Sequence, residues 1–427
     1  MEPLLPTGLR DWTLRGVRLL DPATGRDEAC ADLFCAGGRL AGAPAPGAPV
    51  FDGAGLLAMP AAIDPHVHFR QPGAEDAETV ATGLAAAARG GVGTVVAMPN
   101  TAPPLDTPAR VRGQFALAAA ARSPVRLLVA GCCTEGRAGR AVAPLEEIAA
   151  AGAVAFSDDG AMVARDEVMR ETMRRAAALG LPVMDHAVVP ALQGAVRDGA
   201  LARALGLRAF PDAAETRAVA RDLALAAETG AHIHLQHLSA GASADLVAAA
   251  RANGVRVSAE ATPHHLLLAC EDIPGDDANW KMNPPLGTRA DRARLRAAVL
   301  DGTIDCFATD HAPHPAAAKA RGFPDAPFGV IGLETALAAT WEATVAQEGM
   351  APLDWCARWT LGPAAALGLP APTLAPGAPA RVALLRLAPW TVRAEDLASK
   401  SRNTPMLGRV FPLRPVALLA PGTEDAR

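Results

Sequence analysis

The chain has 427 residues, of which 50% are hydrophobic and 20% charged, an ordinary balance for a globular protein. Its net charge of −5 argues against nucleic acid as a partner, because proteins that bind nucleic acid carry basic surfaces. No run approaches the roughly 18 apolar residues of a membrane span, and the first residues lack the pattern of a secretory signal. Seven cysteines without a CxxC pair are expected to be reduced, so we expect a cytoplasmic protein that binds no membrane.

The two ends of the chain share a composition that differs from the middle. Residues 1–58 and 365–427 contain short apolar runs broken by glycine and proline, which is typical of β strands joined by turns. Both ends are therefore predicted to form one small β-sandwich domain, with residues 59–364 inserted between them.

A repeated unit fills residues 59–364. An alanine-rich amphipathic segment ends at glycine, which favours a helix with a left-handed C-terminal residue, and an apolar run follows within a few residues. Continuous apolar runs are typical of parallel strands that are buried on both faces. Eight such α/β units predict a closed (β/α)8 barrel of the TIM type. The predicted strands lie in residues 58–69, 92–99, 125–133, 153–160, 181–186, 231–237, 255–263 and 303–311.

Histidines and aspartates follow several of these strands directly. In such barrels the reactive groups project from the carboxyl ends of the strands. His66 and His68 lie two residues apart, so a regular strand turns both to one face. Each polar residue alone could cap a strand or a helix, but their coincidence at one edge of the barrel predicts a single site. The candidates are His66, His68, Asp158, His186, His237 and Asp310.

Four imidazoles and two carboxylates suit a divalent transition metal, and zinc best. Six donors are too many for one tetrahedral ion, so two zinc ions that share a carboxylate and a hydroxide are expected. Such a pair lowers the pKa of the shared water and polarises a carbonyl group. Asp310, after the last strand, is expected to move the proton, and His314 on the following loop is a candidate for substrate binding.

With these motifs in view, the chain resembles the amidohydrolase superfamily and, in detail, the class I dihydroorotases of pyrimidine synthesis. The motifs span residues 64–405 and read DPHVHFRQPG, VVAMPNTAPPLDT, AFSDDG, MDHA, IHLQHLSA, KMNPPLG, IDCFATDHAPH, PFGVIGLETAL and SKSRNTP. The resemblance implies that N-carbamoyl-L-aspartate closes reversibly to L-dihydroorotate in UMP biosynthesis. A metal-bound bridging hydroxide and Asp310, as general acid and base, would carry out the reaction.

The resemblance also implies roles for individual residues. The first zinc would be bound by His66, His68, Asp158 and Asp310. Asp158 would bridge to the second zinc, which is bound by His186 and His237. The substrate carboxylate would contact Arg70, Asn100 and His314, because a guanidinium matches a carboxylate in two places. His68 would also contact the substrate. The ring amide would contact Asn283 and the backbone of Phe328 and Gly329. A homodimer is expected, with aspartate transcarbamoylase as a possible partner.

Two alternatives stay open from the sequence. One is another cyclic amidohydrolase, such as allantoinase or dihydropyrimidinase; many of these relatives bridge their metals with a lysine or place a tyrosine at the substrate. Here the first lysine is Lys281 and tyrosine is absent, which disfavours them. The other is a non-catalytic partner of aspartate transcarbamoylase, which is expected to lose metal ligands. Gln71, Ala187 and Gly287 depart from the family pattern and bear on rate, not on the class of reaction.

Overall fold

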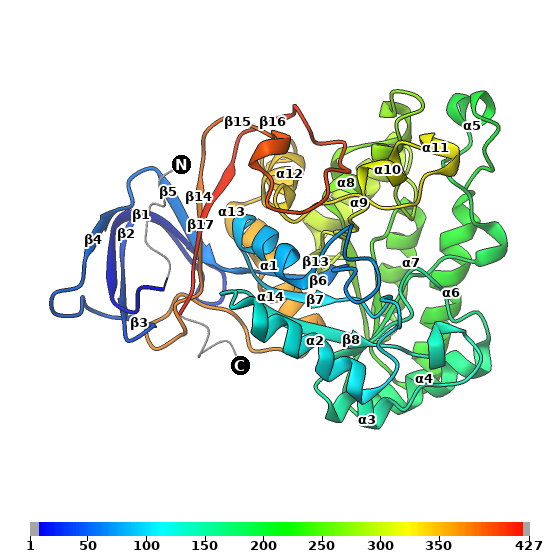
Figure 1. The fold of residues 1–427 in the computed structure, drawn as a ribbon, viewed down its shortest axis with the longest axis horizontal. Coiled ribbons are helices and arrows are strands. Elements are labelled where there is room, and N and C mark those ends of the chain that lie inside the picture. The colour runs from blue at the N-terminus through cyan, green and yellow to red at the C-terminus, as the bar shows by residue number, and fades with distance from the viewer. Residues whose placement is uncertain (1–7, 422–427) are drawn as a thin grey trace.

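The computed structural model describes residues 8–421, and its larger unit is the predicted barrel (Figure 1). Eight parallel strands are hydrogen-bonded in the order of the sequence, and the first and last meet where His311 pairs with Val67. The His68 amide also donates to the His311 carbonyl at 2.9 Å, so the barrel is closed at this edge. The strands are β6 (Ala62–Val67), β7 (Val92–Ala97), β8 (Arg126–Gly131), β9 (Ala155–Phe156), β10 (Val183–Asp185), β11 (Ile233–Leu235), β12 (Val257–Ala261) and β13 (Cys306–Phe307).

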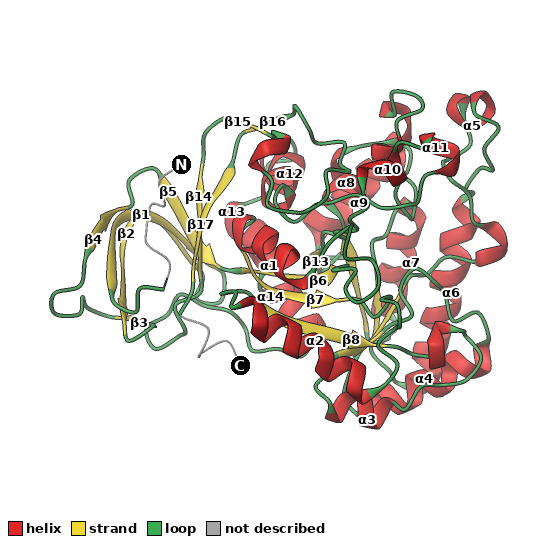
Figure 2. Ribbon diagram, viewed as in Figure 1, coloured by secondary structure: helices red, strands yellow, loops and turns green. Residues whose placement is uncertain are grey.

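Helices surround these strands and cover the outside of the barrel (Figure 2). Gly230 and Gly302 end two of them with φ of 70° and 86°, as the sequence predicted for helices that stop at glycine. The longer helices are α1 (Val80–Arg89), α2 (Pro108–Ala121), α3 (Leu145–Ala150), α4 (Asp166–Ala178), α6 (Asp212–Thr229), α7 (Gly241–Ala252), α9 (Arg289–Asp301), α13 (Pro352–Trp359) and α14 (Leu361–Ala366). The shorter ones are α5 (Ala200–Ala204), α8 (Pro263–Leu267), α10 (Ala316–Lys319), α11 (Gly322–Asp325) and α12 (Ala336–Thr340). Across residues 8–421 we find no helix with the length and apolar character needed to cross a bilayer.

Both ends of the chain build a second sheet beside the barrel, as predicted. Its seven strands follow the order β17-β14-β5-β1-β2-β3, with β4 paired to β1. They are β1 (Trp12–Asp21), β2 (Arg26–Ala36), β3 (Arg39–Ala41), β4 (Val50–Asp52), β5 (Leu56–Pro60), β14 (Val382–Arg386) and β17 (Arg414–Leu419). Ala58 on β5 lies opposite Leu384 on β14, and both side chains are buried in a core separate from that of the barrel. The exact residues that divide the two units stay a prediction.

The chain between β15 (Trp390–Thr391) and β16 (Val410–Phe411) leaves this sheet and packs against the barrel. Two buried carboxylates hold it in place. Glu334 accepts from the amides of Ala398 at 2.7 Å and Ser399 at 3.1 Å, and Glu78 accepts from the amide of Lys400 at 3.1 Å. Residues 398–400 are therefore tied to the barrel by charge-assisted hydrogen bonds.

Two glycines in helices give a matched test of the packing. A Cβ at Gly362 in α14 would lie 2.1 Å from the backbone oxygen of Asp305, whereas one at exposed Gly113 in α2 would meet nothing within 4 Å. We predict that Gly362→Ala lowers the free energy of unfolding by about 1–3 kcal/mol through overpacking. Gly113→Ala should raise it by about 0.5–1 kcal/mol, because alanine is the better helix former. Urea denaturation measures both, and equal effects of the two substitutions would contradict this packing.

Candidate metal centre and substrate pocket

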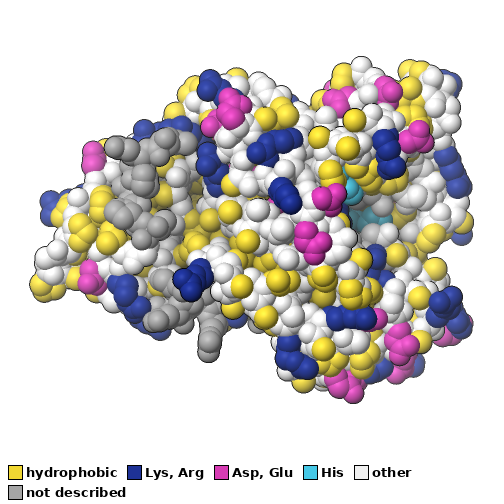
Figure 3. Space-filling model, in the orientation of Figure 1, with side chains coloured by type: hydrophobic (Ala, Val, Ile, Leu, Met, Phe, Trp, Pro, Cys, Tyr) yellow, Lys and Arg dark blue, Asp and Glu magenta, His cyan; other side chains and the backbone are white. Residues whose placement is uncertain are grey.

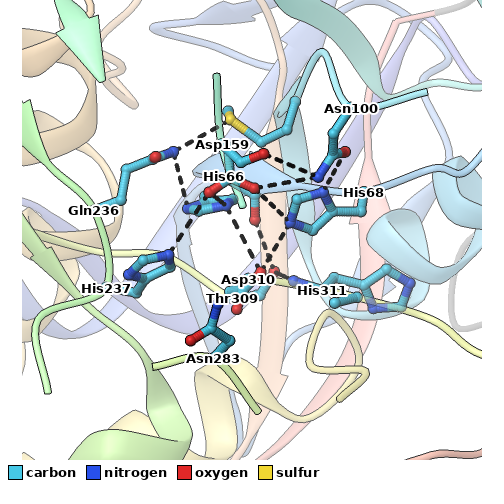
Figure 4. Close-up of polar contacts among 12 residues, drawn as sticks. His66, His68, Asn100, Asp159, Gln236, His237, Asn283, Thr309, Asp310 and His311 are labelled. Carbon is cyan, nitrogen blue, oxygen red and sulfur yellow. Dashed lines mark hydrogen bonds and ion pairs between the residues drawn. The ribbon is translucent and has the colours of Figure 1, made fainter. Parts of the chain in front are cut away.

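Histidines and aspartates from separate strands converge at the carboxyl edge of the barrel (Figure 4). The His68 Nε2 lies 3.0 Å from an oxygen of Asp310 and 3.3 Å from an oxygen of Asp159. The His66 Nε2 lies 3.4 Å from Asp159 and 3.7 Å from Asp310. All four side chains are buried. Two overlapping sets of side chains here have donor atoms close enough to hold a metal ion: His66, His68 and Asp310, and His66, Asp159 and His237.

A second group of donors shares the Asp159 carboxylate. The His237 Nε2 lies 3.7 Å and the His186 Nδ1 lies 3.9 Å from the Asp159 oxygen that faces His66. The same two nitrogens are 2.9 Å apart. The ligand atoms of a tetrahedral zinc at its usual bond length of about 2.0–2.1 Å stand roughly 3.3–3.4 Å from one another. The separations in the second group, from 2.9 to 3.9 Å, lie on both sides of that value.

The structure corrects one predicted ligand. Asp158 is buried but turned away from the histidines: its carboxylate accepts from the amides of Cys133 at 3.0 Å and Thr134 at 3.2 Å, and from the Thr134 hydroxyl. Asp158 therefore fastens the chain after β9 to the chain after β8. The next residue, Asp159, occupies the shared position instead. The other five predicted ligands lie where the sequence placed them, at one edge of the barrel.

At three of the site residues an unusual backbone conformation sets the direction of the side chain. Arg70, His237 and Asp310 have positive φ of 55°, 30° and 45°, which is uncommon for residues with a side chain. Each lies just past the end of a strand, where the alternation of side chains stops. His234 and His237 are three residues apart, so on a regular strand their side chains would face opposite sides. Because the strand ends before His237, the His237 side chain reaches the centre although that of His234 also faces the interior of the barrel. Such backbone strain is typical of functional sites.

Neighbouring polar groups orient the imidazoles. The His66 Nδ1 lies 2.7 Å from Glu260, and the His68 Nδ1 lies 2.9 Å from the side-chain oxygen of Asn100. Because each Nδ1 hydrogen is directed at an oxygen, each Nε2 can offer its lone pair to a metal. The His66 Nε2 and one oxygen of Asp159 are buried without a hydrogen-bond partner. Orphaned buried atoms of this kind are expected where a cation binds.

The charges of the centre also suit a cation. His66 and His237 lower the pKa of Asp159 well below its usual value against the effect of burial. Contact with His68 lowers the pKa of Asp310 to about 2, again against burial. Burial lowers the pKa of His186 to about 3, so its ring is neutral at neutral pH. Against the effect of burial, Asp159 raises the pKa of His66 and His237, so metal binding at these two rings would release protons.

A cavity of about 350 Å³ opens next to these donors, and Figure 3 shows histidine side chains at the bottom of this hollow. The Arg70 guanidinium is partly buried beside it and donates to the Pro313 carbonyl at 3.2 Å. The Asn283 amide nitrogen lies 3.0 Å from the His186 Nε2. All the predicted substrate-binding residues line this one cavity: His68, Arg70, Asn100, Asn283, His314, Phe328 and Gly329.

The sequence analysis missed the residues that support this centre. Glu260 accepts from His234 at 2.9 Å while it contacts His66, and the amide of His237 donates to it at 3.1 Å. It lies inside strand β12, where it is completely buried. A charged residue within an otherwise apolar strand was the available signal, since acids are rarely buried without a partner.

Two departures from the family pattern have structural explanations. The side-chain oxygen of Gln71 accepts from the amide of Val80 at 3.0 Å, at the beginning of α1. At Gly287 a Cβ would lie 2.5 Å from the Ser239 carbonyl and 2.7 Å from the Asp291 Cβ, so this position has no room for a larger side chain. Ala187 is buried beside His186, and nothing in the structure explains why an acid is absent there.

Solved structures of cyclic amidohydrolases share this architecture. The L-hydantoinase (dihydropyrimidinase) from Arthrobacter aurescens superimposes with a TM-score of 0.84 at 24% identity and covers 97% of this chain and 96% of its own. The dihydropyrimidinase from Brevibacillus agri has a TM-score of 0.82 at 20% identity, over 96% of this chain and 94% of its own. These two structures show that the chain shares their fold.

Sequence relatives are more specific. Residues 55–243 match the family model described as dihydro-orotase-like. The dihydroorotase of Pelotomaculum thermopropionicum is 41% identical over 96% of this chain and 97% of its own, and that of Bacillus caldolyticus is 45% identical over 88% of each. The chain belongs to the dihydroorotase family.

The two adjacent aspartates make a direct test of the centre. We predict that Asp159→Asn lowers the metal content of the purified protein, because a neutral amide is a weaker ligand for a cation than a carboxylate is. Asp158→Asn should keep the metal and lower only the melting temperature, through its lost hydrogen bonds. Metal analysis by mass spectrometry together with thermal denaturation separates the two variants. Loss of metal from the Asp158 variant alone would contradict the assignment.

Proposed function

We propose that the chain is a zinc-dependent dihydroorotase that interconverts N-carbamoyl-L-aspartate and L-dihydroorotate. One observation carries the proposal: six histidine and aspartate donors lie beside a cavity that is also lined by the partly buried Arg70. The names and identities of the sequence relatives support the same reaction. We propose two zinc ions for each chain, one in each group of donors around Asp159.

Arg70 is the principal contact for the substrate carboxylate. Its planar guanidinium can donate two parallel hydrogen bonds, and burial strengthens them by excluding water. We propose that Asn100, His68 and His314, which line the same cavity, complete this carboxylate site. The amide of Asn283 and the backbone of Phe328 and Gly329 would then hold the ring amide.

Asp310 is the residue that moves the proton. Its carboxylate is anionic because its pKa is low, and it lies 3.0 Å from the His68 Nε2 at the edge of the cavity. In ring opening, Asp310 accepts a proton from the attacking water and gives it to the ring nitrogen as the C–N bond breaks. In ring closure it takes a proton from the carbamoyl nitrogen as the C–N bond forms, and it gives that proton to the hydroxyl of the substrate carboxyl group, which leaves as water when the C–O bond breaks. When bound, the two cations would acidify that water and polarise the carbonyl group.

The position of the lysines supports this reaction over those of the related hydantoinases. Asp159 holds the shared position, and the ammonium groups of Lys281 and Lys319 donate instead to backbone carbonyls away from the cluster, at Pro324 and Ala278. The complete donor set disfavours a non-catalytic scaffold. We also propose a homodimer, a possible aspartate transcarbamoylase partner and a cytoplasmic location. All seven cysteines are free, which supports the location because cytosolic proteins rarely form disulfides.

The test of the function is an assay of the zinc-loaded protein with dihydroorotate beside allantoin and dihydrouracil. We expect turnover of dihydroorotate in preference to the other two rings, since only dihydroorotate carries the carboxylate that Arg70 binds. Preferred turnover of allantoin or dihydrouracil would contradict the proposal.

Asp310→Asn tests the proton transfer. We predict that this variant keeps at least one metal ion and loses about 10²–10⁴-fold in kcat, the usual contribution of a general acid–base group. Asp245→Asn is the matched control, because exposed Asp245 pairs only with Arg294 on the surface. Near-normal kcat in the Asp310 variant would remove Asp310 from the mechanism.

A further inference from the structure

One motif of the sequence, SKSRNTP, has no role in the site described so far, yet it reaches the wall of the cavity. Asn403, in this motif, is 3% exposed. Its side-chain nitrogen donates to the carbonyls of Ala312 and Gly329, both at 3.0 Å. Its side-chain oxygen accepts from the amide of His314 at 3.1 Å. One side chain from near the end of the chain thus contacts three residues that line the substrate cavity.

The side-chain amide of Asn403 provides the hydrogen-bond donors and the acceptor that its partners require. Two carbonyl oxygens need a donor with two hydrogens, and the backbone amide of His314 needs an acceptor; asparagine provides both. An aspartate of the same shape would direct an oxygen at two carbonyls. The Asn403 backbone is fixed as well, since its carbonyl accepts from the amide of Ile331 at 2.9 Å.

These bonds join two segments that are distant in the sequence. The loop that contains α10 and α11 separates residues 312–314 from residues 328–331. Asn403 is hydrogen-bonded to both segments. They approach so closely that a Cβ at Gly329, whose φ is 134°, would lie 2.8 Å from Ala312 and 3.0 Å from the His314 Nε2. At this spacing the His314 Nε2 reaches the Phe328 carbonyl at 2.7 Å.

The segment that carries Asn403 has hydrogen bonds of its own to the barrel, so its position does not depend on the loop that forms the cavity wall. Glu334 and Glu78 fix the backbone of residues 398–400, as described above. The hydroxyl of Ser401 also donates to the Ala77 carbonyl at 2.7 Å. The segment that carries Asn403 is therefore anchored on the barrel independently of the cavity wall that it supports.

We propose that Asn403 is a positioning residue for the substrate: it sets the distance between His314 and the Phe328–Gly329 backbone. The inference rests on the proposed function, because it takes these groups as contacts of the substrate. Asn403 itself lines no part of the cavity and acts only through its neighbours.

The experiment compares Asn403→Ala and Asn403→Asp with the wild type, in the zinc-loaded protein with dihydroorotate. We expect KM to rise by about 10–100-fold, as for the loss of one or two hydrogen bonds, with metal content unchanged and a much smaller fall in kcat. The isosteric Asn403→Asp should be at least as impaired as Asn403→Ala. Asn253→Asp, at an exposed asparagine on α7's C-terminal end, controls for the change of amide to acid.

A double-mutant cycle with His314→Ala separates positioning from general stabilisation. If Asn403 acts through His314, the double variant should raise KM by clearly less than the product of the single effects. Fully additive effects, an unchanged KM in Asn403→Asp, or a lower melting temperature with normal KM would each overturn the inference. If Asn403→Ala does not fold, the isosteric Asn403→Asp decides. A wild type that does not turn over dihydroorotate refutes the proposed function itself, whereas a normal Asn403→Asp variant refutes only the role of Asn403.

Discussion

The Asp159 carboxylate is the group on which the site depends. It lies within 3.3–3.9 Å of four imidazoles and is almost completely buried. A buried anion is costly unless positive charge compensates it, and a second anion, Asp310, lies on the far side of the same histidines. Against the effect of burial, Asp159 raises the pKa of His66 and His237, and the protons on these rings compensate its charge. Cations bound by the same donors would replace those protons and neutralise both carboxylates.

The fold supplies the orientation that such a site requires. Strands that end at one edge of the barrel bring donors together, and a positive φ at His237 and Asp310 turns their side chains inward. A second layer then fixes the rings: Glu260 holds His66, and Asn100 holds His68. The same principle extends to the substrate cavity, whose wall is held by the chain that returns from the terminal sheet. The C-terminal part of the chain therefore contributes, through Asn403, to the wall of the cavity.

The sequence predicts the architecture well because its signals are local and repeated. Alternating apolar runs and alanine-rich segments with terminal glycines predict all eight strands of the barrel, and the strand-end rule locates His66, His68, His186, His237 and Asp310. It chose Asp158, whereas the structure places Asp159 among the histidines. Strand β9 has only two residues, too few for alternation to define a face, and the choice depends on hydrogen bonds from Cys133 and Thr134.

Other contributions depend on contacts between distant parts of the chain. Glu260 reads as one residue of a buried strand, and Asn403 lies 74 residues after Gly329, whose carbonyl it binds. Neither position carries a local pattern that indicates its partner. Their roles follow from the closure of the barrel and from the packing of the terminal segment, which only the three-dimensional structure provides.

The most direct test of the account is anomalous X-ray diffraction from crystals grown with zinc. The account predicts two zinc peaks, each within a bonding distance of about 2.0–2.2 Å of an oxygen of Asp159. One peak should be shared with His66 and His68, and the other with His186 and His237. A single peak, no peak at these residues, or zinc bound to Asp158 instead would contradict it.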